Sequence, residues 1–474
     1  MNRLAQLDVR YVWHPFTQMR EWMRQEPIVI VRGRGPRLWD VHGRAYLDAN
    51  ASIWTNLHGH CHPVLNRAVR AQLNKIAHSS ALGLANEPAS LLAAQLVRLA
   101  RLRGKQSLTP PLTNPTLEKV FFSDDGSTAL EVALKLAYEA SRRLGRAGKT
   151  PRFLGLQGAY HGDTVGAVSL GHIDLFHRTY AGLLFKSDAV MAPYCYRCPF
   201  NQAKPERADA RTWRRCRWEC LDQLENKLAR ARRQGRPYAA FVFEPLLQGA
   251  AGMIPQPHGW LRQAAALARA HGAFLIADEV MTGFGRTGTL FACHREGVQP
   301  DFLALAKGLT GGYLPMAATL TTLEVFNAFL GEYAEFKTFF HGHSYTANQL
   351  GAAAALASLQ LLQQPGAAAT RQRLARHLAA ALQTLWTLPT VGDIRQEGLV
   401  AGIELVKDWR TRESFPLAAR VGFRVCEAMA RRGVLTRPIG NVIVLMPPYC
   451  VTPTQIERMV EVLAAAVREV LGPD

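Results

Sequence analysis

The sequence lacks any apolar run long enough to cross a lipid bilayer, so we expect no membrane-spanning segment and no membrane partner. The first sixteen residues also lack the apolar centre of a secretory signal peptide, which predicts a cytoplasmic protein. No internal repeat, low-complexity tract or long linker interrupts the 474 residues. Hydrophobic residues make up 48% and charged residues 20% of the chain, as is typical of globular proteins. A chain of this length is expected to form two closely packed domains.

Cysteine is scarce, with eight residues in the chain, and without a secretion signal we expect no disulfide framework. Four of the cysteines form two short-spaced pairs, namely Cys195 with Cys198 and Cys216 with Cys220. Such pairs occur in zinc ribbons, and three prolines in the same segment indicate an irregular insertion. The pattern leaves two interpretations open, a bound zinc ion or reduced structural thiols. We assign no metal to the functional site.

Acidic residues are also few, with 37 Asp and Glu against 56 Lys and Arg and a formal net charge of +19. This charge invites a nucleic-acid hypothesis. The arginines are nevertheless scattered through expected helices, as at 211–215 and 230–233, and no nucleic-acid-binding motif accompanies them. We therefore expect solvated helix faces and no nucleic-acid partner. A positive field would also suit an anionic substrate and cofactor.

The middle of the chain alternates expected strands and helices. Strands are predicted at 119–122, 152–156 and 238–243, and helices at 129–144 and 259–270. This alternation predicts an α/β fold, with a mostly parallel sheet covered by helices on both faces.

The last third of the chain has a different character. Alanine-rich helices are predicted at 350–362 and 370–385, short strands at 402–405 and 441–445, and a final helix after Thr452, with Gln455 completing a capping box. We expect a smaller α+β domain here. The predicted division is 1–60 in the small domain, 61–335 in the large domain with the cysteine-containing insertion at 188–220, and 336–474 in the small domain.

Two expected strands end on charged residues. The run at 273–280 reaches Asp278, and the run at 301–308 reaches Lys307. Buried parallel strands end this way where their carboxyl ends open onto a site. Pyridoxal 5′-phosphate (PLP) chemistry requires this pair, because a lysine binds the cofactor as a Schiff base and a carboxylate keeps its ring nitrogen protonated. Ordinary solvated strand ends are the alternative for either residue alone.

Three further features could serve a planar, phosphorylated cofactor and an acidic substrate. Gly126 and Ser127 stand where a strand passes into a helix, which is a natural phosphate site, although an ordinary N-cap has the same pattern and Asp125 would have to point away. Tyr160 could stack on a ring, and Arg437 could bind a carboxylate. The run at 283–288 matches a dinucleotide fingerprint, but no helix is predicted after it, so we interpret it as a glycine-rich turn.

The motifs together resemble the class III PLP-dependent aminotransferases. The resemblance rests on TGFGRTG at 282–288 and KGLTGG at 307–312, and it extends from WHPFT at 13–17 to RPIG at 437–440. With SIW at 52–54, QGAAGM at 248–253 and HGHS at 341–344, the chain most resembles the branch that converts 8-amino-7-oxononanoate to 7,8-diaminononanoate in biotin biosynthesis. The resemblance implies PLP fold type I, a large domain with a mostly parallel sheet plus a smaller α+β domain.

The resemblance also implies a role for individual residues. Lys307 would be the catalytic Schiff-base lysine, and the cofactor would be held by Gly126, Ser127, Tyr160, Asp278, Lys307, His343 and Ser344. In the family the contact matching His343 and Ser344 comes from the second subunit, which implies a homodimer with shared active sites. Substrate contacts would come from Phe16, Ile53, Trp54, Tyr160, Gly342 and Arg437, with Arg437 binding the carboxylate of the oxo acid.

Several positions depart from the pattern of members that use S-adenosylmethionine as amino donor. Those members carry two tryptophans at the position of Ile53-Trp54, a tyrosine at Phe16 and Pro-Thr at His343-Ser344. The loss of an aromatic surface at Ile53 would weaken stacking with a sulfonium, so the sequence leans to lysine as donor. Asp125 also stands where a serine is expected.

Two other functions remain as alternatives. One is another class III ω-amino acid or diamine transaminase that uses pyruvate or 2-oxoglutarate, and the other is a basic binding protein built on the cysteine cluster.

Overall fold

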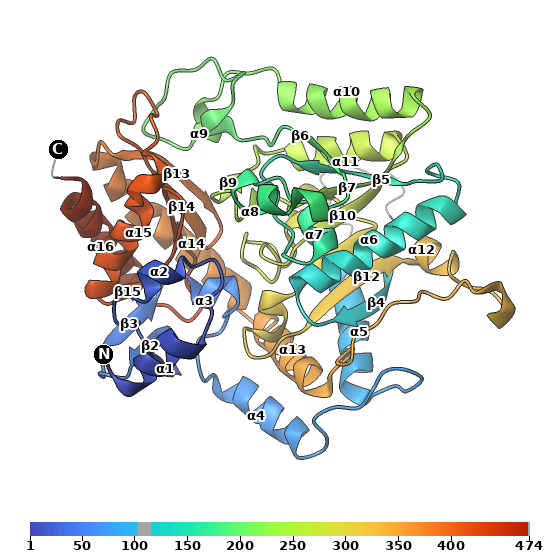
Figure 1. Cartoon of the computed structure of the whole chain (residues 1–474), viewed down its shortest axis with the longest axis horizontal. Coiled ribbons are helices and arrows are strands. Elements are labelled where there is room, and N and C mark those ends of the chain that lie inside the picture. Colours follow the sequence, from blue (N-terminus) through green and yellow to red (C-terminus); the bar gives the residue numbers. More distant parts are fainter. Residues whose placement is uncertain (103–114, 473–474) are drawn as a thin grey trace.

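The computed structural model describes residues 1–102 and 115–472, and a seven-stranded sheet forms its centre (Figure 1). The strand order is β4 (Leu117–Ser123), β12 (Ala317–Thr322), β11 (Phe302–Leu305), β10 (Phe274–Asp278), β7 (Tyr238–Phe243), β5 (Arg152–Leu156) and β6 (Asp188–Val190). Strand β12 runs antiparallel to both of its neighbours, whereas the strands from β11 to β6 are parallel to one another. The predicted α/β fold with a mostly parallel sheet is therefore confirmed.

Helices cover both faces of this sheet. One face packs against α6 (Gly126–Arg143), and the other against α5 (Glu87–Ala100), α10 (Glu219–Arg233), α11 (Trp260–Ala270) and α13 (Gln349–Leu362). Within β10, Phe274 and Ile276 enter the α6 core, whereas Leu275 and Ala277 enter the opposite core. Side chains alternate across a strand, so a strand buried on both faces is apolar at successive positions.

A second core lies between two smaller sheets and the C-terminal helices. One sheet consists of β1 (Ile30–Arg34), β2 (Arg37–Asp40), β3 (Ala45–Asp48) and β15 (Val434–Leu435), and the other of β13 (Val391–Glu397), β14 (Val400–Leu405), β17 (Val442–Leu445) and β16 (Pro438–Ile439). The helices are α14 (Ala367–Leu382), α15 (Val421–Arg431) and α16 (Pro453–Leu471). Strand β3 pairs in parallel with β15, which brings the first 50 residues against the C-terminal part. The predicted domain boundaries stay a prediction, and α13 packs with the large sheet.

The remaining elements are short and connect or border these cores. They are α1 (Arg3–Tyr11), α2 (Met19–Trp22), α3 (Ala51–Trp54), α4 (Pro63–Leu73), α7 (Val165–Ser169), α8 (Asp174–His177), α9 (Ala210–Trp213), α12 (Leu323–Asn327), β8 (Leu247–Gln248) and β9 (Ile254–Pro255), with 3-10 turns at Arg178–Leu183, Cys195–Arg197, Ala292–Glu296, Lys307–Thr310, Tyr333–Glu335, Gln383–Thr387 and Leu417–Ala419.

Capping explains where two helices begin. Helix α6 starts three residues earlier than predicted, because the Asp125 side chain accepts a hydrogen bond from Thr128 N at 2.9 Å and caps the helix. The predicted capping box of α16 is confirmed: Gln455 N donates to Thr452 Oγ1 at 3.2 Å, and Thr452 N donates to Gln455 Oε1 at 2.9 Å. Both ends satisfy backbone N–H groups that a helix leaves unpaired.

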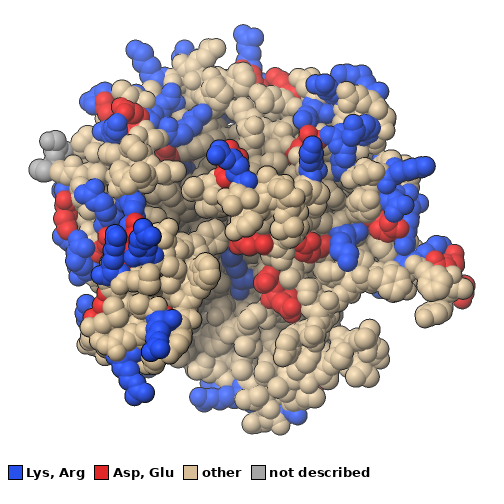
Figure 2. Space-filling view, viewed as in Figure 1, with Lys and Arg blue, Asp and Glu red and all other residues tan. Residues whose placement is uncertain are grey.

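The surface of the molecule carries its positive charge in a dispersed form. Lys and Arg side chains are spread over the face shown in Figure 2 and are interspersed with acidic ones around a hollowed centre. Within the described ranges, no helix combines the length and apolar character needed to cross a membrane.

Candidate active site

Asp278 and Lys307 lie at the carboxyl ends of neighbouring parallel strands. Asp278 is the last residue of β10 and pairs with Ala304 of β11, and Lys307 follows two positions after β11 ends. Lys307 adopts a left-handed backbone conformation with φ of 43°. Such conformations are rare outside glycine and concentrate at functional sites. The backbone conformation of Lys307 therefore indicates a functional role, as does its amine.

The Asp278 carboxylate is anchored on both oxygens. Oδ2 lies 2.7 Å from Nδ1 of His161, and Oδ1 accepts a hydrogen bond from Val280 N at 3.0 Å. Burial alone would lower the pKa of His161, but the hydrogen bond to Asp278 and its negative charge raise the pKa. The two contacts therefore fix the orientation of the buried Asp278 side chain.

Lys307 occupies an environment that makes its amine less basic. Burial lowers the pKa of Lys307, while the charges of Asp278 and Glu244 act in the opposite direction. Its Nζ lies 4.6 Å from the centre of the Trp54 ring. Within the described chain, the amine makes no hydrogen bond or ion pair, so it is available for a covalent or proton-transfer role.

The amino end of α6 forms a cradle close to Asp278. A side chain at Gly126 would collide with Val280, two residues after Asp278, so only glycine fits this approach. Ser127 Oγ lies 2.7 Å from Thr164 Oγ1 and accepts a hydrogen bond from Thr164 N at 2.9 Å. The Asp125 side chain does not point away from this helix start, because it accepts a hydrogen bond from Thr128 N at 2.9 Å. A helix start of this kind binds phosphate well.

Aromatic side chains form one wall of the site. The Tyr160 hydroxyl donates to Asp163 Oδ2 at 2.6 Å, and burial raises the pKa of Tyr160. Its ring lies parallel to His177 with centroids 6.3 Å apart and meets Phe176 edge-on. Phe16 reaches the same group, because its ring packs edge-to-face on Phe176 at 5.3 Å. Tyr160 and Phe16, distant in sequence, thus belong to one aromatic cluster.

The predicted substrate contacts are partly assembled in the single chain. Ile53 is 45% exposed and adjoins Trp54, which packs with Met281. Arg437 is exposed and, among described residues, has no hydrogen-bond or ion-pair partner. Its guanidinium is therefore free to bind an anion.

The segment at 341–344 lies beside the start of α6 of the same chain. His343 Nδ1 is 3.4 Å from Asp124 Oδ2, while the Ser344 carbonyl accepts a hydrogen bond from His78 Nε2 at 2.8 Å. Gly342 is exposed. The predicted donation of this segment to a second subunit stays a prediction.

The donor set fits a phosphorylated pyridine aldehyde such as PLP. It combines a buried amine, a carboxylate fixed for a ring nitrogen, a helix start with a serine hydroxyl and an aromatic wall. Three buried polar atoms of this region also have no partner within the described chain: His161 Nε2, Trp54 Nε1 and Thr282 Oγ1. Buried polar groups are normally hydrogen-bonded, so these atoms are consistent with a site that receives a polar ligand.

Sequence reasoning missed several members of this site. Phe176, His177 and Met281 carried no recognisable motif, although Phe176 and His177 are an aromatic pair within an otherwise irregular segment. Glu244 directly follows β7, and no motif marked it in the sequence. It accepts a hydrogen bond from Gly249 N at 2.7 Å, and burial raises its pKa to about 7.

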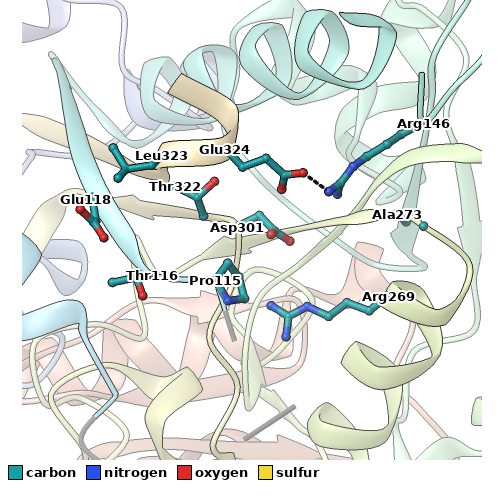
Figure 3. Close-up of a pocket in the computed structure, with 11 residues that line it drawn as sticks. Pro115, Thr116, Glu118, Arg146, Arg269, Ala273, Asp301, Thr322, Leu323 and Glu324 are labelled. Atoms are coloured by element: carbon teal, nitrogen blue, oxygen red, sulfur yellow. Dashed lines mark hydrogen bonds and ion pairs between the residues drawn. The ribbon is translucent and has the colours of Figure 1, made fainter. Parts of the chain in front are cut away.

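A cavity of about 480 Å³ lies elsewhere in the molecule (Figure 3). Asp301 and Ala273 line it next to the starts of β11 and β10, and an ion pair between Arg146 and Glu324 crosses one side. It therefore lies at the amino ends of the parallel strands, opposite Asp278 and Lys307. Ligand sites of such sheets lie at the carboxyl ends, so this cavity is not the candidate active site.

The cysteine-containing insertion is fastened to the C-terminal sheet. Arg197 Nε donates to Glu404 Oε1 at 2.7 Å, and Arg211 Nη2 donates to the Gln396 carbonyl at 2.9 Å. Arg211 also forms an ion pair with Glu397, so the prediction that it lies on a solvated helix face is wrong. The four cysteines of the insertion border one small cavity, but within the described residues no three His, Cys, Asp or Glu side chains form a set that could hold a metal ion.

We expect the cysteines to stabilise the insertion without taking part in catalysis. Cys195 is 8% exposed, and burial raises its pKa to about 12. Replacing Cys195 and Cys198 with Ser should lower the free energy of unfolding by about 1–3 kcal/mol, because a hydroxyl is costly to bury without a partner. Denaturant unfolding and activity per folded molecule test this, with exposed Cys61→Ser as control. Full stability with lost turnover would contradict it, and elemental analysis should find at most one zinc per chain.

Comparison with known proteins places the chain among relatives of similar length. Residues 18–467 match the family described as Aminotransferase class-III. The chain is 48% identical over 467 residues to an adenosylmethionine-8-amino-7-oxononanoate aminotransferase of Nitratidesulfovibrio vulgaris, covering 98% of this chain and 81% of the relative. It is 46% identical over 469 residues to the protein of that name from Geobacter sulfurreducens, covering 99% and 98%.

The chain also superposes on solved structures of aminotransferases. The crystal structure of adenosylmethionine-8-amino-7-oxononanoate aminotransferase from Methanocaldococcus jannaschii superposes with a TM-score of 0.88 at 39% identity and covers 98% of this chain and 99% of that one. An (S)-enantioselective omega-transaminase from Thermomicrobium roseum superposes with a TM-score of 0.86 at 30% identity, covering 99% and 98%.

Proposed function

The chain belongs to the class III aminotransferases, a PLP-dependent family of fold type I, and on this premise we propose that it converts 8-amino-7-oxononanoate to 7,8-diaminononanoate in biotin biosynthesis. The names of relatives at 41–48% identity over nearly the whole chain support this substrate. The observation that carries the chemistry is the placement of Asp278 and Lys307 at adjacent strand ends, with a helix start and an aromatic wall around them.

Each residue of the site has a separate role in the proposed transamination. PLP, when bound, supplies an electrophilic carbonyl and an electron-withdrawing ring. Asp278 would hold the ring nitrogen, Gly126 and Ser127 would bind the phosphate, and Tyr160 would lie against the ring. Lys307 would carry the cofactor and move the proton at the substrate carbon that bears the amino group, and its lowered pKa suits this role. Arg437 binds the carboxylate of the oxo acid.

The amino donor is S-adenosylmethionine or lysine. Ile53 and Phe16 leave fewer aromatic faces for a sulfonium than the pattern of adenosylmethionine-dependent members, which favours lysine. The relatives carry adenosylmethionine in their names, which favours the other donor.

We further infer a cytoplasmic homodimer. Large hydrophobic side chains are exposed in the single chain, among them Tyr333 at 88%, Phe340 at 70% and Leu82 at 91%. Extended apolar exposure is typical of a surface that another subunit covers. His343 and Ser344 would then reach the phosphate of the partner site. Light scattering of the purified protein should give twice the chain mass.

The experiment that tests the function supplies both donors. Purified holoenzyme is incubated with 8-amino-7-oxononanoate and either S-adenosylmethionine or lysine, and 7,8-diaminononanoate is measured by mass spectrometry. Product formation with one donor supports the proposal and identifies the donor. Activity with an ω-amine and pyruvate or 2-oxoglutarate, without this product, would instead support the alternative transaminase.

Arg437→Ala should impair the half-reaction that consumes the oxo acid. Loss of a charge-assisted contact to a carboxylate costs about 2–3 kcal/mol. Single-turnover kinetics should show this loss with 8-amino-7-oxononanoate and a much smaller one with the amino donor. Arg424→Ala, at an exposed position of α15, provides the control. Equal losses in both half-reactions would place Arg437 elsewhere.

A further inference from the structure

Residues Ala51–Trp54 (α3) form a turn of left-handed helix next to Lys307. Their φ angles are 45°, 49°, 58° and 69° along the turn. Trp54 N donates to the Asn50 carbonyl at 2.9 Å and Thr55 N to the Ala51 carbonyl at 3.0 Å, so the turn is hydrogen-bonded. None of these residues is glycine, and side chains disfavour this conformation at every position. Contacts with the rest of the chain must therefore hold the turn.

Asp48, at the end of β3, supplies these contacts. Its Oδ1 accepts a hydrogen bond from Ser52 N at 3.0 Å, and its Oδ2 accepts one from Ser52 Oγ at 2.8 Å. Oδ2 also lies 2.9 Å from His60 Nε2. The His60 backbone is in turn paired with Gly35, at 2.8 and 2.9 Å. Asp48 is 3% exposed, so these bonds are shielded from water.

The turn presents its side chains to the candidate substrate site. The Trp54 ring lies 4.6 Å from Lys307 Nζ, and Ile53 precedes it on the exposed side. Asp48 also pairs with Leu435 of β15, two residues before Arg437. The turn and Arg437 therefore leave the same pair of parallel strands, whereas Gly126 and Asp278 belong to the large sheet and its helices.

We propose that Asp48 is a positioning residue for substrate binding, which holds the left-handed turn and thereby places Ile53 and Trp54 beside Lys307. The inference rests on the proposed function of this site. The proposal assigns the affinity for substrates and the affinity for the cofactor to different parts of the fold. The turn sets the affinity for substrates, and the large sheet sets the affinity for the cofactor.

Asp48→Ala in the holoenzyme should raise the KM for substrates roughly 10- to 100-fold, the effect expected when binding groups are displaced by about 1 Å. The dissociation constant of PLP, measured by equilibrium dialysis of the apoprotein, should stay unchanged. Asp40→Ala is the matched control, because Asp40 is 2% exposed in the same sheet and accepts a hydrogen bond from Tyr46 Oη at 2.8 Å. It should lower stability and leave KM unchanged.

A glycine tests the role of backbone strain directly. Glycine adopts positive φ without a steric penalty, so adding Ser52→Gly to Asp48→Ala should restore most of the lost substrate affinity. Should Asp48→Ala fail to fold, Asp48→Asn keeps the shape and should raise KM in the same direction. An unchanged KM in the folded Asp48 variants, or a double variant no better than Asp48→Ala, would overturn the proposal.

The same variants are also compared with the wild type in the half-reaction with an amino donor, which is followed by the absorbance of the cofactor. If the wild-type enzyme cannot use 8-amino-7-oxononanoate, the proposed function is refuted. The positioning role of Asp48 is then tested by the half-reaction with the amino donor.

Discussion

Replacing Lys307 with Ala should lower the rate of transamination by roughly 10⁴-fold or more, because the variant loses both the covalent attachment of PLP and the group that moves the proton. Burial lowers the pKa of this amine, so a neutral, proton-accepting form is available at lower pH than in an exposed lysine. Removing a buried amine relieves a desolvation cost, and we therefore expect the variant to fold.

Borohydride reduction of the wild-type holoenzyme followed by peptide mapping provides an independent measurement. The pyridoxyl label should be found on Lys307. Lys75→Ala, at an exposed lysine 3.5 Å from Glu87, should keep full activity and serves as control. A label on a different lysine would refute the assignment.

Asp278→Asn should reduce the rate about 10²-fold or more, because a preorganised charge next to the reacting ring is a large electrostatic contribution. The amide has the shape of the carboxylate but lacks its charge. Since the contact with Asp278 raises the pKa of His161, that pKa should fall in the variant, which NMR titration of the imidazole can measure.

Asp301→Asn is the matched control for Asp278→Asn. Asp301 is 6% exposed, precedes the neighbouring strand and accepts a hydrogen bond from Leu275 N at 2.8 Å, but it lies at the opposite edge of the same sheet. It should lower the free energy of unfolding and leave activity per folded molecule unchanged. Near-normal half-reaction rates in Asp278→Asn would show that Asp278 does not hold the ring nitrogen.

Local patterns in the sequence were sufficient to predict most of the sheet and part of the site. The apolar runs before Asp278 and Lys307 predicted β10 and β11, and the alternation of strands and helices predicted a mostly parallel sheet with helices on both faces. A strand buried on both faces must be apolar along its length, and its first charged residue then marks the end. Capping chemistry at Thr452 is local as well, since donor and acceptor are three residues apart.

Contacts between distant segments were decided by the tertiary structure. Phe176 joins Tyr160 and Phe16, helix α13 packs with the large sheet, and Arg211 pairs with Glu397, but no short motif encodes these contacts because each depends on how separate elements pack. The left-handed turn at Ala51–Trp54 is the strongest case. Its residues have no intrinsic preference for positive φ, so the sequence determines which side chains the turn carries, and only the folded contacts of Asp48 determine where they point.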